Sequence, residues 1–436
     1  MGRFFSSISL HVGPFTYVGG RRVRDRYIHL ICALIAFFGV SGIFVTRSVP
    51  RLHAPGGHSV DVAYIATSLA AAKSAALANE SGQSALFTAP STYNWLQFGG
   101  TSQHTSENNQ ESIISSSNVA TLSILFRVRL PRIADSSPVY LTAVSTPIGV
   151  RDVVYVTTKD GRIIAIDAHD GSKIWHRQHG PGTCLTPQNY PCYTAASPAI
   201  DPNLQFGYSY GLDGYVHKYQ VGDGIELSGA GWPELVTMKP EVEKVSSSLA
   251  TATTSTGTTY LYVLTSSFGD AADYQGHLTA INLTDPAHTQ KVFNAMCSNQ
   301  SVHFVLAPGK PDCSLTHSGE WGRAGPLYDP QSNRIFVATG NGVWDPATSM
   351  WGDSVLALLP DGRGTLSGPV DSYTPVNQQD LNGHDKDLGG ANPVALPVPR
   401  SSLFQDVVVQ AGKDGILRLI NLTNPSGQGG PGHLGG

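Results

Sequence analysis

One hairpin-sized pattern occurs twice in this chain, at an offset of 254 residues. Residues 152–167 read DVVYVTTKDGRIIAID, and residues 406–421 read DVVVQAGKDGILRLIN, with seven of sixteen positions identical and no gap. In both copies two apolar, β-branched runs flank an Asp-Gly step. That step is typical of a tight β-hairpin, because glycine readily adopts the positive φ that such a turn requires. The chain is therefore expected to consist of copies of one β unit.

Weaker copies of the pattern lie between these two, at residues 207–220, 260–282 and 333–358. The expected turn glycines are Gly161, Gly214, Gly276, Gly352 and Gly415, spaced by 53 to 76 residues. Strand-rich units of 40 or more residues, lengthened by insertions, predict an all-β fold of the β-propeller type. A β-sandwich is the alternative, but it would not repeat one hairpin at a multiple of a blade length.

The composition excludes several other classes. Charged residues make up 14% of the chain, against about 25% in an average soluble protein, and 47 glycines and 28 prolines interrupt it. Coiled coils and most helical bundles need more charge, and a chain that is 41% hydrophobic is not a disordered tail. Residues 1–26 carry five arginines and one aspartate, or +4, so the remainder of this −4 chain carries −8. Such a domain is not expected to bind nucleic acid.

The N-terminal region predicts a membrane anchor. Residues 27–45 contain no charged side chain, and about 20 apolar residues suffice for a helix to cross a bilayer. Because arginines precede this segment, the positive-inside rule places residues 1–26 in the cytoplasm as a basic tail and the bulk of the chain on the extracytoplasmic side, periplasmic or extracellular. A cleaved signal peptide and a buried core helix are the alternatives. Residues 46–92, rich in Ala, Ser, Gly and Pro, are interpreted as a stalk, and residues 93–436 as the propeller domain.

The cysteines agree with an exported domain. Cys32 lies in the predicted anchor, and the other four are Cys184, Cys192, Cys297 and Cys313. An even number suggests two disulfides, for which three connectivities exist; we favour the local pairs Cys184–Cys192 and Cys297–Cys313. Four free thiols are the alternative. No zinc site is predicted, because the chain contains no C-x-x-C and no pair of histidines at ligand spacing.

The first copy continues as AIDAHDGSKIW over residues 165–175. This A-x-D-x-x-x-G-x-x-x-W pattern resembles the tryptophan-docking motif of quinoprotein propellers, the fold of the pyrroloquinoline quinone (PQQ) dehydrogenases. Residues 95–122 resemble the lead-in to the first blade of that family, and the resemblance covers roughly residues 95–436. It implies that Trp175 packs between neighbouring blades. It also implies eight blades, of which about five units are recognisable here.

The resemblance also implies two residues that hold the cofactors. PQQ is a flat, tricarboxylic ortho-quinone that needs a stacking ring, a cation, usually Ca²⁺ with oxygen ligands, and a base. Trp321, in GEWGRAGPLYDP, matches the tryptophan that forms the floor beneath PQQ, and Asn341, in TGNG, matches a Ca²⁺ ligand. Each has a structural alternative: Trp321 as a blade-packing residue, and Asn341 as part of an Asn-Gly hairpin turn.

Two further residues complete the implied site. Asp387, in NGHDKDLGG, matches the base that takes the alcohol proton, with Asp385 as the second choice. The alternative for Asp387 is a turn-capping role. Lys413, in QAGKDG, matches a cation that contacts the quinone oxygens. Since Lys159 holds the same place in the first copy, Lys413 can also be interpreted as a consensus residue of the repeat.

The chain departs from the family pattern in several ways. The segment at 266–280, SSFGDAADYQGHLTA, lacks the glutamate that binds Ca²⁺ in the family, and Asp270 or Asp273 would have to replace it. The vicinal cysteine pair above PQQ and the arginine that follows it are missing. There is also no C-x-x-C-H haem site.

Two functions remain open from the sequence. The first is a membrane-anchored oxidoreductase that oxidises an alcohol or sugar with PQQ and Ca²⁺ and passes electrons to a membrane quinone or a soluble carrier. The second is a cofactor-free propeller that binds an envelope protein or a polysaccharide as an assembly scaffold. The matches at Trp321, Asn341 and Asp387 favour the enzyme, whereas the missing glutamate, arginine and vicinal disulfide favour the scaffold.

Overall fold

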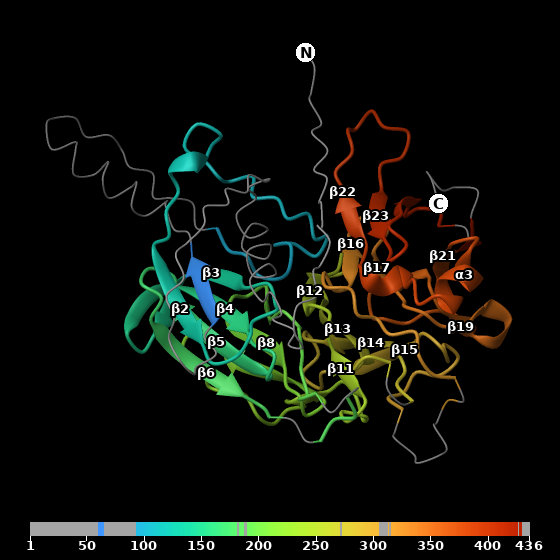
Figure 1. Ribbon diagram of the computed structural model, residues 1–436, viewed down its shortest axis with the longest axis horizontal. Helices are drawn as coiled ribbons and strands as arrows, with labels where there is room; N and C mark the ends of the chain where they lie inside the picture. Colours follow the sequence, from blue (N-terminus) through green and yellow to red (C-terminus); the bar gives the residue numbers. More distant parts are fainter. Residues whose placement is uncertain are drawn as a thin grey trace, which may run out of the picture.

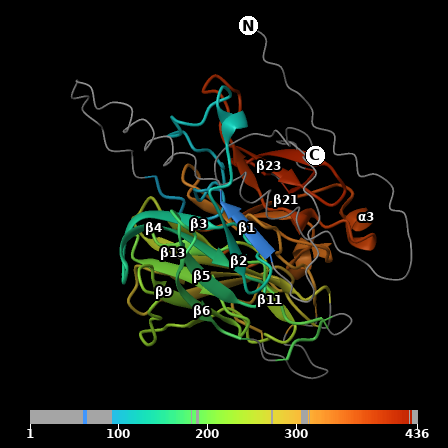
Figure 2. The same ribbon diagram turned by 60° about the vertical axis from the view of Figure 1, so that its left-hand side comes forward.

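The computed structural model describes residues 60–64, 93–180, 183–186, 190–270, 273–304, 313, 315–425 and 427–429. Regular structure in these residues is almost entirely β. They form five antiparallel sheets that follow one another in chain order, from the cyan and green strands of the first sheet to the red strands of the last (Figures 1 and 2). Most strands pair with the strand next to them in the chain.

The strands of the five sheets have the following bounds. The first sheet contains β3 (Val139–Thr146), β4 (Gly149–Thr157), β5 (Arg162–Asp167) and β6 (Lys173–Gln178). The second contains β7 (Ala199–Ile200), β8 (Phe206–Tyr210), β9 (Tyr215–Gln220) and β10 (Glu234–Leu235). The third contains β11 (Glu243–Val245), β12 (Ala250–Thr253), β13 (Thr259–Ser267), β14 (His277–Asn282) and β15 (Gln290–Asn294). The fourth contains β16 (Leu327–Asp329), β17 (Arg334–Ala338), β20 (Val355–Leu358) and β21 (Asp371–Thr374), joined in parallel by β25 (Gly427–Gln428). The fifth contains β22 (Val394–Leu396), β23 (Val407–Ala411) and β24 (Leu417–Asn421).

The remaining elements are short. Strand β1 (Val60–Tyr64) pairs with β2 (Phe126–Leu130), and β18 (Trp344–Asp345) pairs with β19 (Met350–Trp351). The described helices are η1 (Val119–Thr121), η3 (Pro346–Thr348), α3 (Gln378–Gly383) and η4 (Leu388–Gly390).

Each pair of consecutive sheets shares one hydrophobic cluster. Between the first and second sheets, for example, Val139 and Tyr155 pack with Ile200 and Tyr219. Equivalent clusters join the second sheet to the third, the third to the fourth and the fourth to the fifth. Sheets that bury both faces against the preceding and the following sheet are the blades of a propeller. The predicted all-β propeller is therefore confirmed, and the β-sandwich alternative is wrong.

Trp175 shows how adjacent blades are joined. Its side chain is 6% exposed, and its Nε1 donates a hydrogen bond to the carbonyl oxygen of Val221, 2.9 Å away in the second sheet's chain segment. The indole lies against the backbone of Gly224, where a Cβ atom would come within 2.5 Å of the ring. The motif predicted from residues 165–175 thus packs across a blade boundary, and only glycine fits beneath the tryptophan.

Three of the five expected turn glycines have the left-handed backbone that a tight hairpin requires. Gly161, Gly214 and Gly415 have φ values of 76°, 92° and 77° and lie between the paired strands β4–β5, β8–β9 and β23–β24. Gly276 and Gly352 instead lie shortly before β14 and β20, and neither has a positive φ. In these two units, longer connections replace the two-residue turn.

Both predicted disulfides are present. Cys184 is bonded to Cys192, and Cys297 to Cys313. Cys297 and Cys313 are buried, together with Phe304, whereas the other pair is only partly buried. The preference for local pairing is confirmed, and the alternative of four free thiols is wrong.

We expect the double substitution Cys297→Ser/Cys313→Ser to lower the free energy of unfolding by about 3 kcal/mol, the chain-entropy value for a loop of roughly 15 residues. Cys184→Ser/Cys192→Ser is the matched control. It should cost less, because its loop is half as long, with a sequence separation of 8 against 16. Urea unfolding without reductant measures both. Equal losses in the two variants would show that loop length and burial do not determine the contribution of these bonds.

The predicted basic tail (1–26), the anchor (27–45) and nearly all of the stalk (46–92) lie outside the described residues. Strand β1 lies within the stalk segment. Among the residues that the structure describes, none belongs to a helix with the length and apolar character of a membrane span. The predicted anchor and the domain bounds stay predictions.

Candidate functional site

The Asp387 carboxylate is the centre of a compact polar cluster. Its Oδ2 accepts a hydrogen bond from Trp321 Nε1 at 3.1 Å, and its Oδ1 accepts one from the backbone N–H of Asn341 at 3.0 Å. Lys413 Nζ lies 2.9 Å from Oδ2. The Asp387 side chain is 4% exposed, so these donors replace the water that an ionised carboxylate would otherwise bind. Four residues predicted separately from the sequence therefore meet at one carboxylate.

These residues come from the fourth and fifth blades. Trp321 precedes β16, Asn341 lies between β17 and β18, Asp387 directly precedes η4, and Lys413 lies in the turn between β23 and β24. Glycines allow the segments to approach closely. A Cβ at Gly340 would lie 3.4 Å from Trp321 Nε1 and 2.9 Å from a backbone oxygen.

The contacts of Asp387 and Asn341 differ from the two structural alternatives, a turn-capping role for Asp387 and a hairpin turn at Asn341. Asp387 occupies the position before η4, but its side chain makes no capping hydrogen bond to that helix. Asn341 does not form a two-residue hairpin turn, because β17 pairs with β16 and β20, not with β18. The side-chain contacts of Asp387 are therefore with Trp321, Asn341 and Lys413, and not with its own turn.

Lys413 lies between two carboxylates and above an aromatic ring. Its Nζ is 2.9 Å from Asp385 as well as from Asp387, and 5.2 Å from the centre of the Trp321 ring. Burial alone would lower the pKa of Lys413, but the hydrogen bonds to Asp387 and Asp385 outweigh burial and raise that pKa. The Asp385 side chain is 63% exposed, so it is the solvent-exposed member of this ion-pair network.

The first blade repeats this arrangement. Lys159 Nζ lies 3.1 Å from the Asp135 carboxylate, as Lys413 lies beside Asp387. Each lysine also donates its backbone N–H to a carbonyl oxygen in the segment that carries its aspartate partner, to Ile133 and to Asp387 respectively. The repeat itself therefore places a lysine beside an aspartate, as the consensus interpretation of Lys413 expects, whereas its contact with quinone oxygens stays a prediction.

A group of cations surrounds Asp135, and the sequence did not predict it. Arg323 donates to the Asp135 carboxylate at 2.8 Å, next to Lys159. Lys244 is buried, with its Nζ 4.6 Å from the centre of the Tyr193 ring. Burial, followed by the charges of Arg323 and Lys159, lowers the pKa of Lys244 to about 7. Lys159 and Arg323 thus pair with Asp135 directly, whereas Lys244 is influenced by the charges of both Asp135 and Asp270.

Asp353 is a second site residue that sequence reasoning missed. Its Oδ1 accepts a hydrogen bond from the backbone N–H of Leu388 at 3.0 Å, and its own N–H donates to Gly340. It therefore fixes the two segments that carry Asp387 and Asn341. Burial, together with the nearby charge of Asp387, raises the pKa of Asp353 to about 7. The only sequence signal is its place after Trp-Gly, directly before the second strand of the repeat unit.

Asp270 and Asp273 have different surroundings. The Asp270 carboxylate accepts a hydrogen bond from the Tyr274 hydroxyl at 2.7 Å. Burial raises the pKa of Tyr274, and the charges of Asp270 and Asp387 raise it further. Asp273 lies beside buried Lys239, whose Nζ is 3.9 Å from its carboxylate and donates to its carbonyl oxygen. Of the two, Asp270 is the one near the cluster. The roles of all these residues stay predictions.

Comparisons with known proteins agree with this fold. Residues 95–196 match the family model of the glucose/ethanol/alcohol dehydrogenase β-propeller domain. No curated protein sequence matches the chain significantly.

Several solved structures are similar in fold. A quinohemoprotein alcohol dehydrogenase from Pseudomonas putida HK5 superposes with a TM-score of 0.53 at 18% identity, covering 77% of this chain and 47% of that one. The quinohemoprotein alcohol dehydrogenase from Comamonas testosteroni superposes with a TM-score of 0.53 at 14% identity, covering 76% of this chain and 48% of that one. A europium-containing methanol dehydrogenase superposes with a TM-score of 0.51 at 15% identity, covering 77% of this chain and 57% of that one. The chain thus spans about half the length of these structures.

The family match includes the tryptophan-docking motif of the first blade, and the fold similarity extends over about three quarters of the chain. Residues 95–196 thus match the glucose/ethanol/alcohol dehydrogenase β-propeller model, and the described chain has a β-propeller fold similar to that of these quinohemoprotein alcohol dehydrogenases and the methanol dehydrogenase.

Proposed function

We propose that this chain is the propeller of a quinoprotein oxidoreductase that oxidises an alcohol or a sugar, with its domain anchored on the extracytoplasmic side of a membrane. The observation that carries this proposal is the convergence of Trp321, Asn341, Asp387 and Lys413 on one carboxylate. The family resemblance assigns these residues, in this order, to the stacking ring, the metal ligand, the base and the quinone clamp. The electron acceptor would be a membrane quinone or a soluble carrier.

The described residues fit the ring and the charges of PQQ. Trp321 offers a partly exposed indole for stacking, and Lys413 lies above it with one of its three N–H bonds unused by Asp385 and Asp387. A tricarboxylic cofactor also needs positive charge. Arg323, only two residues after Trp321, belongs to the cation group around Asp135 and could take the place of the missing family arginine.

The fit to Ca²⁺ is weaker. Asp387 offers carboxylate oxygens in the cluster, Asn341 enters it through its backbone N–H, and Asp270 offers a carboxylate beyond Tyr274. Ca²⁺ takes six to eight oxygen ligands, so the cofactor and water would have to supply the rest. When bound, PQQ would supply the two-electron acceptor for the hydride of the alcohol.

The residues of the chain support proton transfer. Three donors orient the Asp387 carboxylate, and a carboxylate in this position can accept the hydroxyl proton of a substrate as the hydride leaves. Lys413 orients that carboxylate through its ion pair. Asp385 remains the second candidate for the base, but its exposure surrounds it with water, which weakens its control over a proton.

The proposal predicts Ca²⁺-dependent binding of PQQ to the full chain. Titration with PQQ should quench tryptophan fluorescence with a dissociation constant in the micromolar range or below, and Trp321→Phe should remove most of this quenching. The chain contains six tryptophans, so Trp232→Phe, at a blade boundary beside Tyr208, is the matched control and should quench like the unaltered protein. Absence of quenching in the unaltered protein would contradict the enzyme proposal.

The second candidate function is a cofactor-free scaffold that binds an envelope protein or a polysaccharide. One observation favours it: Asp387 already has partners for both carboxylate oxygens, as in a purely structural ion-pair network. The missing glutamate, together with the engagement of Asp273 by Lys239, also favours it. In that case the fluorescence titration gives no signal, whereas the chain should still bind its partner in a pull-down from envelope extract.

A further inference from the structure

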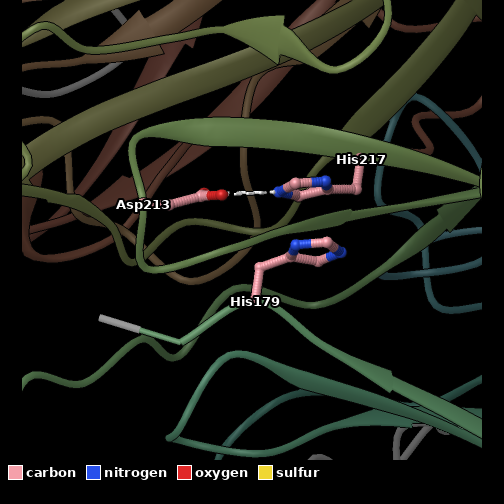
Figure 3. Close-up of side chains that lie close together, drawn as sticks. All are labelled: His179, Asp213 and His217. Atoms are coloured by element: carbon pink, nitrogen blue, oxygen red, sulfur yellow. Dashed lines mark hydrogen bonds and ion pairs between the residues drawn. The ribbon is translucent and has the colours of Figure 1, made fainter. Parts of the chain in front are cut away.

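Four ionisable side chains meet where the first blade packs against the second. His179 directly follows β6 of the first blade. Asp213, His217 and Glu226 belong to the second blade: Asp213 in the β8–β9 turn, His217 within β9, and Glu226 shortly after β9. Figure 3 shows His179, Asp213 and His217 close together, with Asp213 directed at the His217 ring. Since 38 residues separate the two histidines, no local spacing in the sequence reveals this group.

The distances between the donor atoms are short. His217 Nε2 lies 3.1 Å from Asp213 Oδ2, and His217 Nδ1 lies 2.7 Å from Glu226 Oε1. His179 Nε2 lies 2.9 Å from the other oxygen of Glu226. One donor atom from each of His179, Asp213 and His217 can be chosen so that all lie within 4.8 Å of one another. Metal–ligand bonds of about 2.0–2.1 Å in a tetrahedral site place the ligand atoms about 3.4 Å apart, so one ion fits among these donors after small movements.

The chemistry of the donors favours a particular class of ion. Imidazole nitrogen and carboxylate oxygen are ligands for zinc and neighbouring divalent transition metals, whereas Ca²⁺ and Mg²⁺ prefer oxygen alone. Two carboxylates and two neutral imidazoles also balance the charge of a divalent ion in this partly buried place. We propose that His179, Asp213 and His217 bind one divalent metal ion of the zinc class, with Glu226 as the outer carboxylate that orients both rings, and that the ion thereby joins the first blade to the second.

Binding requires one ring to tilt. The two imidazoles are stacked, with ring centres 3.5 Å apart and planes inclined by only 9°, so their lone pairs run parallel. His217 is buried in β9 and held by both carboxylates, whereas His179 lies beyond the end of its strand with 26% of its side chain exposed. His179 is therefore the ring that tilts. Gly211 makes room beside the group, since a Cβ there would lie 2.8 Å from both His217 Nε2 and the His179 Cβ.

The fifth blade shows what a purely structural pair at this place looks like. Arg418 pairs with Asp414 at the positions of the repeat that His217 and Asp213 hold in the second blade. An arginine cannot bind a metal, and it satisfies the turn aspartate by itself. In the second blade a histidine stands in its place, and two further donors, His179 and Glu226, are added from neighbouring segments. His179 and Glu226 are not needed to hold the turn at Asp213.

Isothermal titration tests the proposal on the full chain, purified without a histidine tag, stripped with a chelator and free of PQQ. We expect one tight Zn²⁺ site per chain, competition by Co²⁺, none by Ca²⁺, and an increase in melting temperature with Zn²⁺. His179→Gln should weaken Zn²⁺ binding by at least the roughly tenfold that the loss of even an outer partner of a ligand costs. Asp213→Asn should also weaken it. His176→Gln, an exposed histidine in β6 three residues before His179, is the matched control and should bind like the unaltered chain.

Two results would overturn the proposal. One is the absence of stoichiometric Zn²⁺ binding by the unaltered chain, which would leave the group as a metal-free network with His217 in the role of Arg418. The other is an equal loss of affinity in His179→Gln and His176→Gln, which would indicate adventitious surface binding. Circular dichroism of each variant shows whether it has folded. The outcome does not depend on PQQ binding, so it can fail or succeed separately from the proposed oxidoreductase activity.

Discussion

Replacing Trp175 with alanine should lower the free energy of unfolding by about 3–5 kcal/mol, the usual cost of removing a buried aromatic side chain. The indole fills the space between the first two blades, over Gly224 and beside Tyr155 and Tyr219. Nothing else in the described chain occupies that space, so the substitution would leave a cavity at the boundary. It would also leave the carbonyl oxygen of Val221 with one partner fewer, since the Tyr155 hydroxyl donates to the same atom.

Trp175→Phe separates these contributions. It keeps an aromatic ring above Gly224 but removes the Nε1 hydrogen bond, whose net value is about 1 kcal/mol. We therefore expect a loss well below that of the alanine variant, measured by urea unfolding followed by circular dichroism. A loss below about 1 kcal/mol for Trp175→Ala would mean that the blades do not depend on this contact, although the structure shows the indole 6% exposed.

The fold could be predicted from the sequence because a propeller repeats its local signals. The Asp-Gly turns at Gly161, Gly214 and Gly415 and the docking motif ending at Trp175 each report on one blade, and each depends on contacts between nearby residues. The pairing of Cys297 with Cys313 was predictable for the same reason. Where a unit contains insertions, as around Gly276 and Gly352, the turn geometry could not be inferred from the hairpin pattern.

The candidate site could be predicted only as a set of separate residues. The resemblance identified Trp321, Asn341, Asp387 and Lys413 by order along the chain, but their contacts depend on how the fourth and fifth blades approach each other. Asp353 could not be identified from the sequence, because its carboxyl accepts the backbone N–H of Leu388 in another segment, a contact that local spacing does not indicate.

Groups that assemble across blades were missed for a similar reason. The partners of Asp135 come from the first and fourth blades, with Arg323 lying 188 residues from Asp135 along the chain. His179 and His217 belong to adjacent blades. Neither group can be recognised until the order and packing of the blades are known.

Asp387→Asn should lower dye-linked oxidation of an alcohol by about 10²–10⁴-fold while leaving PQQ bound, because that is the range in which a general base contributes. An asparagine at this position keeps the size of the side chain, but its single carbonyl oxygen can accept only one of the two hydrogen bonds that Trp321 and the Asn341 N–H donate to the carboxylate. It cannot take the proton of the substrate. Fluorescence quenching by PQQ measures binding independently of turnover, so loss of the base and loss of the cofactor are distinguishable.

Asp385→Asn is the matched control, because it removes the other carboxylate that pairs with Lys413. Both variants deprive Lys413 of one anionic partner, so an effect that acts through the position of this lysine should appear in both. A loss of rate caused by the missing base should appear in only one of the two variants. Since Asp385 is 63% exposed and Asp387 only 4%, we expect Asp385→Asn to change the rate by no more than a few-fold. A larger loss in Asp385→Asn than in Asp387→Asn would reverse the assignment of the base.

The stability of the same two variants bears on the scaffold alternative. In a structural network, the buried Asp387 would contribute mainly to folding, and its replacement would leave Lys413, 34% exposed, with Asp385 as its remaining ion-pair partner. Loss of a buried, charge-assisted contact should then appear as a lower free energy of unfolding, by about 1.5–3 kcal/mol, with no PQQ-dependent signal in either protein. In an enzyme, by contrast, a comparable stability cost is accompanied by a much larger loss of rate, since the amide keeps only one of the hydrogen bonds from Trp321 and Asn341 and cannot take a proton. The ratio of these two effects at a single carboxylate therefore distinguishes a catalytic site from a structural remnant of one.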